Sequence, residues 1–317
     1  MKIEKSSLYA IFSSIIVCIF SLIILPLYTE GDQQFYKKFY EGCLDDYLIL
    51  NQQFLCYQST VGSQEPIYFI LAKLASIFLN KDVFISLSNA ILTFFLIKVI
   101  LKYYQRDYSR FFFILLFLTN FYFLVILFSA ERLKFSLFFL VLSFLFYGYK
   151  NLLFLFFSLF THIQSVFLLA SYFVFQVFNN ENSFLKKTLL IFGFIFMFTC
   201  VFFILNTHFE AKFLAFYGAT AEEDKGFVGV LKTSFLIILG CISVRKIAPF
   251  IFGLPIILSS FLLGPARLVM LAFILYLCTI LYYKGKMDVA LFIVMLYFSF
   301  KSIEFVSNIL KYGSGFL

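Results

Sequence analysis

Six side chains that could carry chemistry stand at the ends of apolar segments. They are Asp32, Glu65, Glu131, Arg132, His162 and Arg267. Charged side chains are costly near the hydrocarbon of a bilayer, so their positions there are informative. These six lie far apart in the sequence. If the helices bring them to one membrane face, they form a site that contains acids, arginines and one histidine.

This set of residues suits group transfer at a diphosphate. Arginine presents a planar fork that matches phosphate oxygens and stays charged. Arg132, Arg267 and His162 could bind a lipid diphosphate and stabilise it as a leaving group. A carboxylate could then take the proton from an attacking hydroxyl. The chain has no phosphate-binding glycine loop, paired-histidine zinc motif or Gly-x-Ser-x-Gly elbow, so we predict no cofactor and no metal ion.

Each of these residues also has an ordinary structural explanation. Asp32 could be a solvated loop residue or a helix N-cap, and Glu65 before a proline could simply begin a helix. Both arginines could anchor to lipid headgroups. Glu131 could be a local ion partner of its neighbour, and His162 could form a structural hydrogen bond. The sequence alone leaves these alternatives open.

The composition predicts an integral membrane protein. Of 317 residues, 62% are hydrophobic and only 13% are charged, with a mean hydropathy of +0.97. Soluble domains carry roughly a quarter charged residues. The formal charge of +8 is then simplest to explain by basic cytoplasmic loops, and we expect no nucleic-acid partner.

The fold class that follows is all-α, a polytopic bundle of transmembrane helices in a single membrane domain, 1–317. Nine apolar stretches are candidate crossings: 8–29, 82–101, 111–129, 135–149, 188–206, 227–244, 247–263, 266–283 and 287–310. The run 151–178 is too long for one ordinary helix, and polar residues interrupt it near His162, which predicts two short helices. The total is about eleven crossings.

The distribution of Lys and Arg predicts the orientation. Lys2 and Lys5 precede the first helix, and five further basic loops lie near 98–110, 150, 186–187, 245–246 and 284–286. We place all of them in the cytoplasm. This requires that 66–79 does not cross, so we predict an interfacial helix on the outer face. The N-terminus is then cytoplasmic and the C-terminus lies outside.

Two outer loops are long enough to form structure, 30–81 and 207–226. The first contains Cys43 and Cys56, which could form a disulfide in an oxidising periplasm.

Several short segments resemble the Wzy-type polymerases of bacterial surface polysaccharide, in particular their EpsG-like branch. They are Asp32-x-x-x-Tyr36-x-x-x-Tyr40, Glu65-Pro66-Ile67-Tyr68-Phe69, Arg132 within 129–137, His162 within 159–165, and Arg267 within Gly264-Pro265-Ala266-Arg267. Their order covers about residues 8 to 285. The family often has Gln after this first arginine, whereas Leu133 and Lys134 follow Arg132 here.

The resemblance implies a membrane glycosyltransferase of the bacterial inner membrane with its active face in the periplasm. Such proteins join oligosaccharide repeat units carried on undecaprenyl diphosphate into O-antigen or capsule. The implied catalytic residues are Asp32, as base candidate, and Glu65. Arg132, His162 and Arg267 would bind the diphosphate, and Tyr36, Tyr40 and Glu131 would bind the acceptor. The implied partners are the lipid-linked glycan and membrane lipid, with a chain-length regulator as a further candidate.

Three other functions fit parts of the same pattern. A flippase for lipid-linked glycans would also cross the membrane many times, but it needs charges in the middle of helices that line a cavity. A membrane acyltransferase would need an early histidine, and the two histidines are His162 and His208. A transferase that adds a single sugar from a polyprenyl phosphate is poorly separated from a polymerase by sequence.

Overall fold

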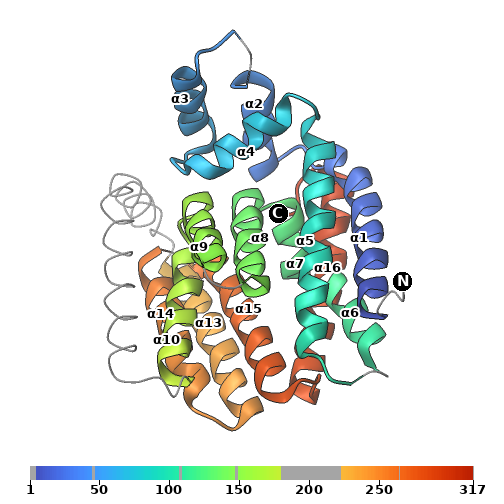
Figure 1. The fold of residues 1–317 in the computed structure, drawn as a ribbon, viewed down its shortest axis with the longest axis vertical. Coiled ribbons are helices and arrows are strands. Elements are labelled where there is room, and N and C mark those ends of the chain that lie inside the picture. Colours follow the sequence, from blue (N-terminus) through green and yellow to red (C-terminus); the bar gives the residue numbers. More distant parts are fainter. Residues whose placement is uncertain are drawn as a thin grey trace. The chain divides into compact units, whose positions relative to one another are not determined.

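The computed structural model describes residues 5–44, 47–106, 109–146, 149–179, 223–263 and 265–316. Every element of regular secondary structure in these ranges is a helix, as Figure 1 shows. The chain forms two compact units. The first contains Met1–Ile163 and Phe292–Leu317, and the second contains Gln164–Leu291.

Five described helices are long and apolar enough to cross a membrane. They are α1 (Lys5–Ile24), α5 (Lys81–Tyr103), α13 (Glu223–Val244), α15 (Pro265–Lys284) and α16 (Val289–Tyr312). A short 3-10 helix, η1 (Leu25–Leu27), extends α1. Each of the five coincides with a predicted crossing. The expectation of an all-helical protein with membrane-spanning helices is confirmed at this level.

The predicted crossing 111–129 is broken into two helices. α6 (Arg110–Leu118) and α7 (Phe121–Phe128) meet at a bend of 52°. Asn120 explains the break, because its side-chain oxygen accepts hydrogen bonds from the backbone N–H groups of Tyr122 at 3.0 Å and Phe123 at 3.4 Å. An asparagine that caps a new helix in this way competes with continuation of the preceding one. Counted as one bent span, the pair brings the candidate crossings to six.

Four more helices have 13 to 16 residues, below the length of an ordinary crossing. They are α8 (Glu131–Leu145), α9 (Tyr149–Thr161), α10 (Ser165–Asn179) and α14 (Ala248–Leu263). The break between α9 and α10 falls at His162, as predicted. The stretch 188–206 and residues 207–222 of the predicted loop 207–226 lie outside the described residues, and residues 223–226 of that loop are instead the first turn of α13. The total of about eleven crossings therefore stays a prediction.

The second unit is built from α10, α13, α14 and α15. Gly253 of α14 faces Ile237 of α13 so closely that a Cβ atom on the glycine would lie 2.6 Å from the isoleucine side chain. Phe175 of α10 packs edge-on against Phe252 of α14, with 5.2 Å between ring centroids. Small and aromatic residues thus set the spacing of these helices.

Three short helices gather at one end of the first unit, α2 (Asp32–Gly42), α3 (Leu50–Val61) and α4 (Pro66–Ser76) (Figure 1). All three come from the predicted outer loop 30–81. α4 has 11 residues, so its length of about 16 Å is near half the thickness of the hydrocarbon. α4 alone is therefore too short to cross. Its location at the membrane surface stays a prediction.

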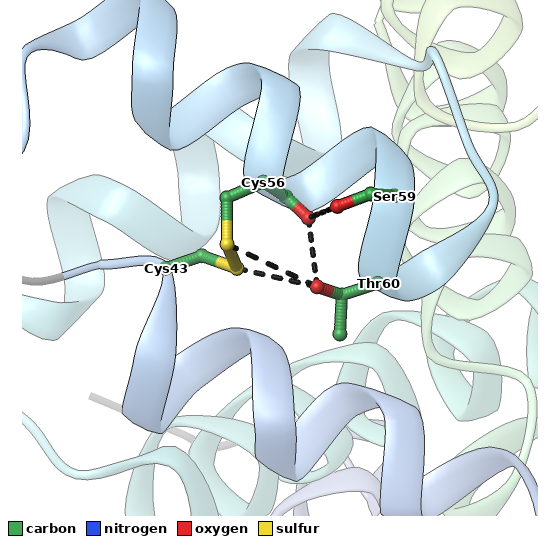
Figure 2. The surroundings of a disulfide bond; sticks show 4 residues. All are labelled: Cys43, Cys56, Ser59 and Thr60. Atoms are coloured by element: carbon green, nitrogen blue, oxygen red, sulfur yellow. Dashed lines mark hydrogen bonds between the residues drawn. A yellow bond between two sulfur atoms is a disulfide. The ribbon is translucent and has the colours of Figure 1, made fainter.

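A disulfide between Cys43 and Cys56 joins the end of α2 to α3, as Figure 2 shows. The two Cα atoms are 5.5 Å apart, within the usual range for a disulfide. Thr60 lies beside both sulfur atoms, and its hydroxyl donates to the Cys56 carbonyl at 2.7 Å. The bond cross-links two of the three short helices.

Replacing Cys56 with serine should lower the free energy of unfolding by about 2–4 kcal/mol, because the unfolded chain gains the entropy of an open loop. Thermal unfolding of the purified protein in detergent would measure this effect. Cys18→Ser is the control, since Cys18 is a free thiol of α1. Equal midpoints for Cys56→Ser and the wild type would mean that the cross-link does not stabilise the short helices.

Candidate active site

Glu65 is the central residue of a buried polar network in the first unit. It is the N-cap residue of α4, and Pro66 occupies the first helical position. A residue before proline avoids the helical conformation, and Glu65 is extended with φ −76° and ψ 108°. Its carboxylate does not cap α4 and is fully buried. The prediction that Glu65 stands at a helix start is confirmed. Its side chain does not cap the helix and instead contacts Arg132 and His162.

The Glu65 carboxylate is surrounded by hydrogen-bonding groups. Arg132 Nη1 donates to Oε2 at 2.5 Å, and Nδ1 of His162 lies 2.8 Å from Oε1. The backbone N–H of Ile163 also donates to Oε1 at 3.2 Å, and the Ser63 hydroxyl donates to Oε2. A carboxylate with this many donors is strongly favoured in its ionised form. The network joins α4, α8 and the end of α9 through residues up to 98 positions apart.

Two tyrosines extend this network. Arg132 Nε donates to the Tyr36 hydroxyl at 3.2 Å, so α2 holds the arginine from a second direction. Tyr57 of α3 donates to the Ser63 hydroxyl at 3.0 Å. Burial, and then the negative charge of Glu65, raises the pKa of Tyr57 far above its ordinary value. Tyr57 is thus a protonated donor that supports the hydroxyl bound to Glu65.

Glu131 belongs to a second network beside the first. Gln33 Nε2 donates to its Oε1 at 3.0 Å, and the Tyr68 hydroxyl donates to its Oε2 at 2.7 Å. Lys81 Nζ lies 3.9 Å from Oε1 and also donates to the Gln33 side-chain oxygen. Burial, and then the charge of Glu131, raises the pKa of Tyr40 of α2.

Glu131 and Arg132 lie at the beginning of a helix, next to an apolar segment as predicted. They are the first two residues of α8, and the loop before them is Ser129-Ala130. Successive residues of a helix point in directions about 100° apart, which explains why these neighbours enter different networks. Glu131 contacts residues of α2, α4 and α5, whereas Arg132 pairs with Glu65.

Asp32 lies at the edge of these networks. It is the first residue of α2, after Gly31 with φ +64°, so it is not the N-cap residue that the sequence suggested as one alternative. Its side chain is half-buried, and the Ser129 hydroxyl donates to Oδ2 at 3.4 Å. The preceding loop is held by α16, since the backbone N–H groups of Thr29 and Glu30 donate to the Gly313 carbonyl at 3.0 and 2.8 Å.

The structure therefore brings together most of the predicted site residues. Those in or beside the two networks are Asp32, Tyr36, Tyr40, Glu65, Glu131, Arg132 and His162. Arg267 is the third residue of α15, at a helix start as predicted, but it lies in the second unit. Its part in the site stays a prediction.

Several members of the networks were missed by sequence reasoning. Lys81 donates to Gln33, Gln33 donates to Glu131, and Ser63 links Tyr57 to Glu65. Gln33 directly follows Asp32, and Tyr68 lies within the segment Glu65-Pro66-Ile67-Tyr68-Phe69. Both could therefore have been proposed from their positions in or beside these segments. No sequence feature near Ser63 indicates that it belongs to the site.

Comparison with protein-family models, curated proteins and solved structures finds no match to this chain. The resemblance to the Wzy-type polymerases is thus carried only by the short segments quoted above. Function has to be argued from the chemistry of the buried networks.

Proposed function

We propose that this chain is a membrane glycosyltransferase that polymerises oligosaccharide repeat units linked to undecaprenyl diphosphate, on the periplasmic face of a bacterial inner membrane. The observation that carries the proposal is the buried Arg132 guanidinium, held by Glu65 and Tyr36 next to His162. A preorganised arginine fork in a desolvated place suits the recognition of phosphate oxygens.

The proposed reaction is one displacement at the anomeric carbon of the growing chain. A hydroxyl at the non-reducing end of a new lipid-linked unit attacks this carbon, and a glycosidic bond forms. The bond from the anomeric carbon to the lipid diphosphate breaks, and the diphosphate leaves with the bonding electrons. Arg132, His162 and Arg267 would stabilise its negative charge. Asp32 would take the proton of the attacking hydroxyl.

The contacts of Glu65 support a positioning role more than a role as base. Its two oxygens already accept from Arg132, Ser63 and Ile163 and contact His162. A carboxylate stabilised in this way is a weak base. We therefore propose that Glu65 orients Arg132 and His162. Asp32 is half-buried at the start of α2, so its carboxylate lies nearer the surface than the fully buried Glu65, which suits a base that must reach substrate.

The second network is the proposed place for the acceptor glycan. Tyr40 lies one turn along α2 from Tyr36, which belongs to the first network, and aromatic rings of this kind pack against apolar faces while their hydroxyls form hydrogen bonds. Glu131 is held in place by Gln33 and Tyr68.

Deletion of the gene should leave a single repeat unit on the surface glycan in place of a ladder of lengths. Arg132→Ala and Arg267→Ala should have the same effect while the proteins remain in the membrane, because the leaving diphosphate loses its cations. A gel of surface glycan with a membrane blot would measure both. Complete loss of surface glycan on deletion would favour a flippase, and an unchanged ladder with altered sugars would favour a single-sugar transferase. Full ladders in both arginine variants would contradict the diphosphate assignment.

A further inference from the structure

Lys134 is a buried lysine that the proposed reaction does not use, and burial lowers the pKa of its ammonium to about 7. It is the fourth residue of α8, its side chain is 1% exposed, and Nζ has no hydrogen-bond partner among the described residues. An ammonium group carries three donors. A buried charge whose donors are not satisfied is costly, and proteins retain one only where something compensates.

The neighbouring charged side chains do not fully neutralise a protonated Lys134. Glu131 and Lys81 are the charged side chains that act on its ammonium, and the Phe135 ring centroid is 5.0 Å from Nζ. Glu131 already contacts Gln33, Tyr68 and Lys81. Two lysines thus share one carboxylate, and the cluster of Lys81, Glu131 and Lys134 has an excess of positive charge when both lysines are protonated.

The start of α8 adds to this positive potential. Its N-cap residue is Ala130, which offers no side-chain cap to the first N–H groups. Side chains on a helix lean toward its N-terminus, and the charge of Glu131, the first residue of α8, acts on the Lys134 ammonium. The N-terminus of a helix favours an anion. Lys81 is 12% exposed, so the cluster is connected to the molecular surface on that side.

We infer that the first turn of α8, with Lys134 and Lys81, is a binding site for a phosphoryl group. Such an anion would supply acceptors to the Lys134 ammonium and neutralise the excess charge of the cluster. The inference does not depend on the proposed polymerisation, because phosphoryl binding can be measured without glycan transfer. Two sources share this chemistry, the diphosphate of a lipid carrier and the headgroup of a phospholipid.

The test is a titration of the full-length protein in detergent with inorganic diphosphate, followed by calorimetry. Lys134→Met should weaken binding at least about tenfold, and Lys81→Met should weaken it less, because that amine is partly solvated. Lys37→Met is the matched control, since the Lys37 side chain is 55% exposed on α2. It should bind like the wild type.

The thermal midpoint of the unliganded protein provides a second measurement. Methionine has nearly the volume of the lysine stem and no charge, so Lys134→Met should unfold at the same or a higher temperature than the wild type. Weaker binding with retained stability would identify Lys134 as a binding residue. The inference is overturned if the wild type does not bind diphosphate, or if Lys134→Met binds it equally well.

Lipid nanodiscs distinguish the two sources. If phosphatidylglycerol nanodiscs compete with diphosphate for the wild type but not for Lys134→Met, the phosphoryl group belongs to a membrane phospholipid. If diphosphate binds equally in nanodiscs and in detergent, the site serves a diphosphate carrier. Either result retains the phosphoryl site.

Discussion

Replacing Glu65 with alanine should destabilise the first unit by about 3–5 kcal/mol, because the substitution leaves a buried arginine without its carboxylate. Arg132 is 6% exposed and His162 is 1% exposed, so water cannot easily take the place of Glu65. The substitution also removes the acceptor of the Ile163 N–H and the Ser63 hydroxyl. Urea or thermal unfolding in detergent, together with the yield of folded protein, would measure the loss.

Glu41→Ala is the matched control for this effect. Glu41 is on α2 with a side chain 67% exposed, and it pairs only loosely with Lys37 at 3.9 Å. Exposed pairs of this kind contribute little, so the control should unfold like the wild type. A Glu65→Ala protein that unfolds at the wild-type midpoint would show that the buried network does not hold α4 against α8 and α9.

Replacing Asp32 with asparagine should abolish polymerisation and leave stability nearly unchanged. Loss of a general base lowers rates by roughly 10²–10⁴-fold. Asparagine has the same shape, and its side-chain oxygen can still accept from Ser129, whose hydroxyl is 3.4 Å from the present carboxylate. The prediction is a wild-type unfolding midpoint with no glycan ladder. Lengths of surface glycan and thermal unfolding would be compared for the same variant.

Glu30→Gln is the control for Asp32→Asn. Glu30 is exposed and only two residues earlier, in the loop that Gly313 holds through backbone bonds. Loss of one carboxylate there should not affect polymer length. If Asp32→Asn retains a full ladder, Asp32 is not the base. If it unfolds more easily by several kcal/mol, its role is structural.

Apolar length and breaks in the apolar runs predicted much of the fold. The long helices α1, α5, α13, α15 and α16 follow directly from stretches that only a bilayer can solvate. His162 marked the break between α9 and α10. The bend at Asn120 was missed, because Thr119 and Asn120 are the polar residues inside a run that is otherwise apolar up to Ser129, and the capping of Tyr122 and Phe123 depends on the side-chain rotamer of Asn120.

The site was only partly predictable from the sequence. Residue types and helix ends pointed to Glu65, Arg132 and His162 as a group. Their pairing could not be derived, because Glu65 is 67 residues from Arg132 and 97 from His162, and only packing of the short helices sets those distances. The separation of Glu131 from Arg132 into two networks follows from the rotation of about 100° between successive residues of α8.

The central claim is that this protein transfers a growing glycan from a lipid diphosphate to a new lipid-linked repeat unit. The most direct measurement uses purified protein in liposomes with undecaprenyl-diphosphate-linked repeat units as the sole substrate. Our account predicts a ladder of glycan lengths, with one undecaprenyl diphosphate released for each bond formed, and neither product from Arg132→Ala. If the folded wild-type protein releases no lipid diphosphate and leaves every repeat unit single, the account is contradicted.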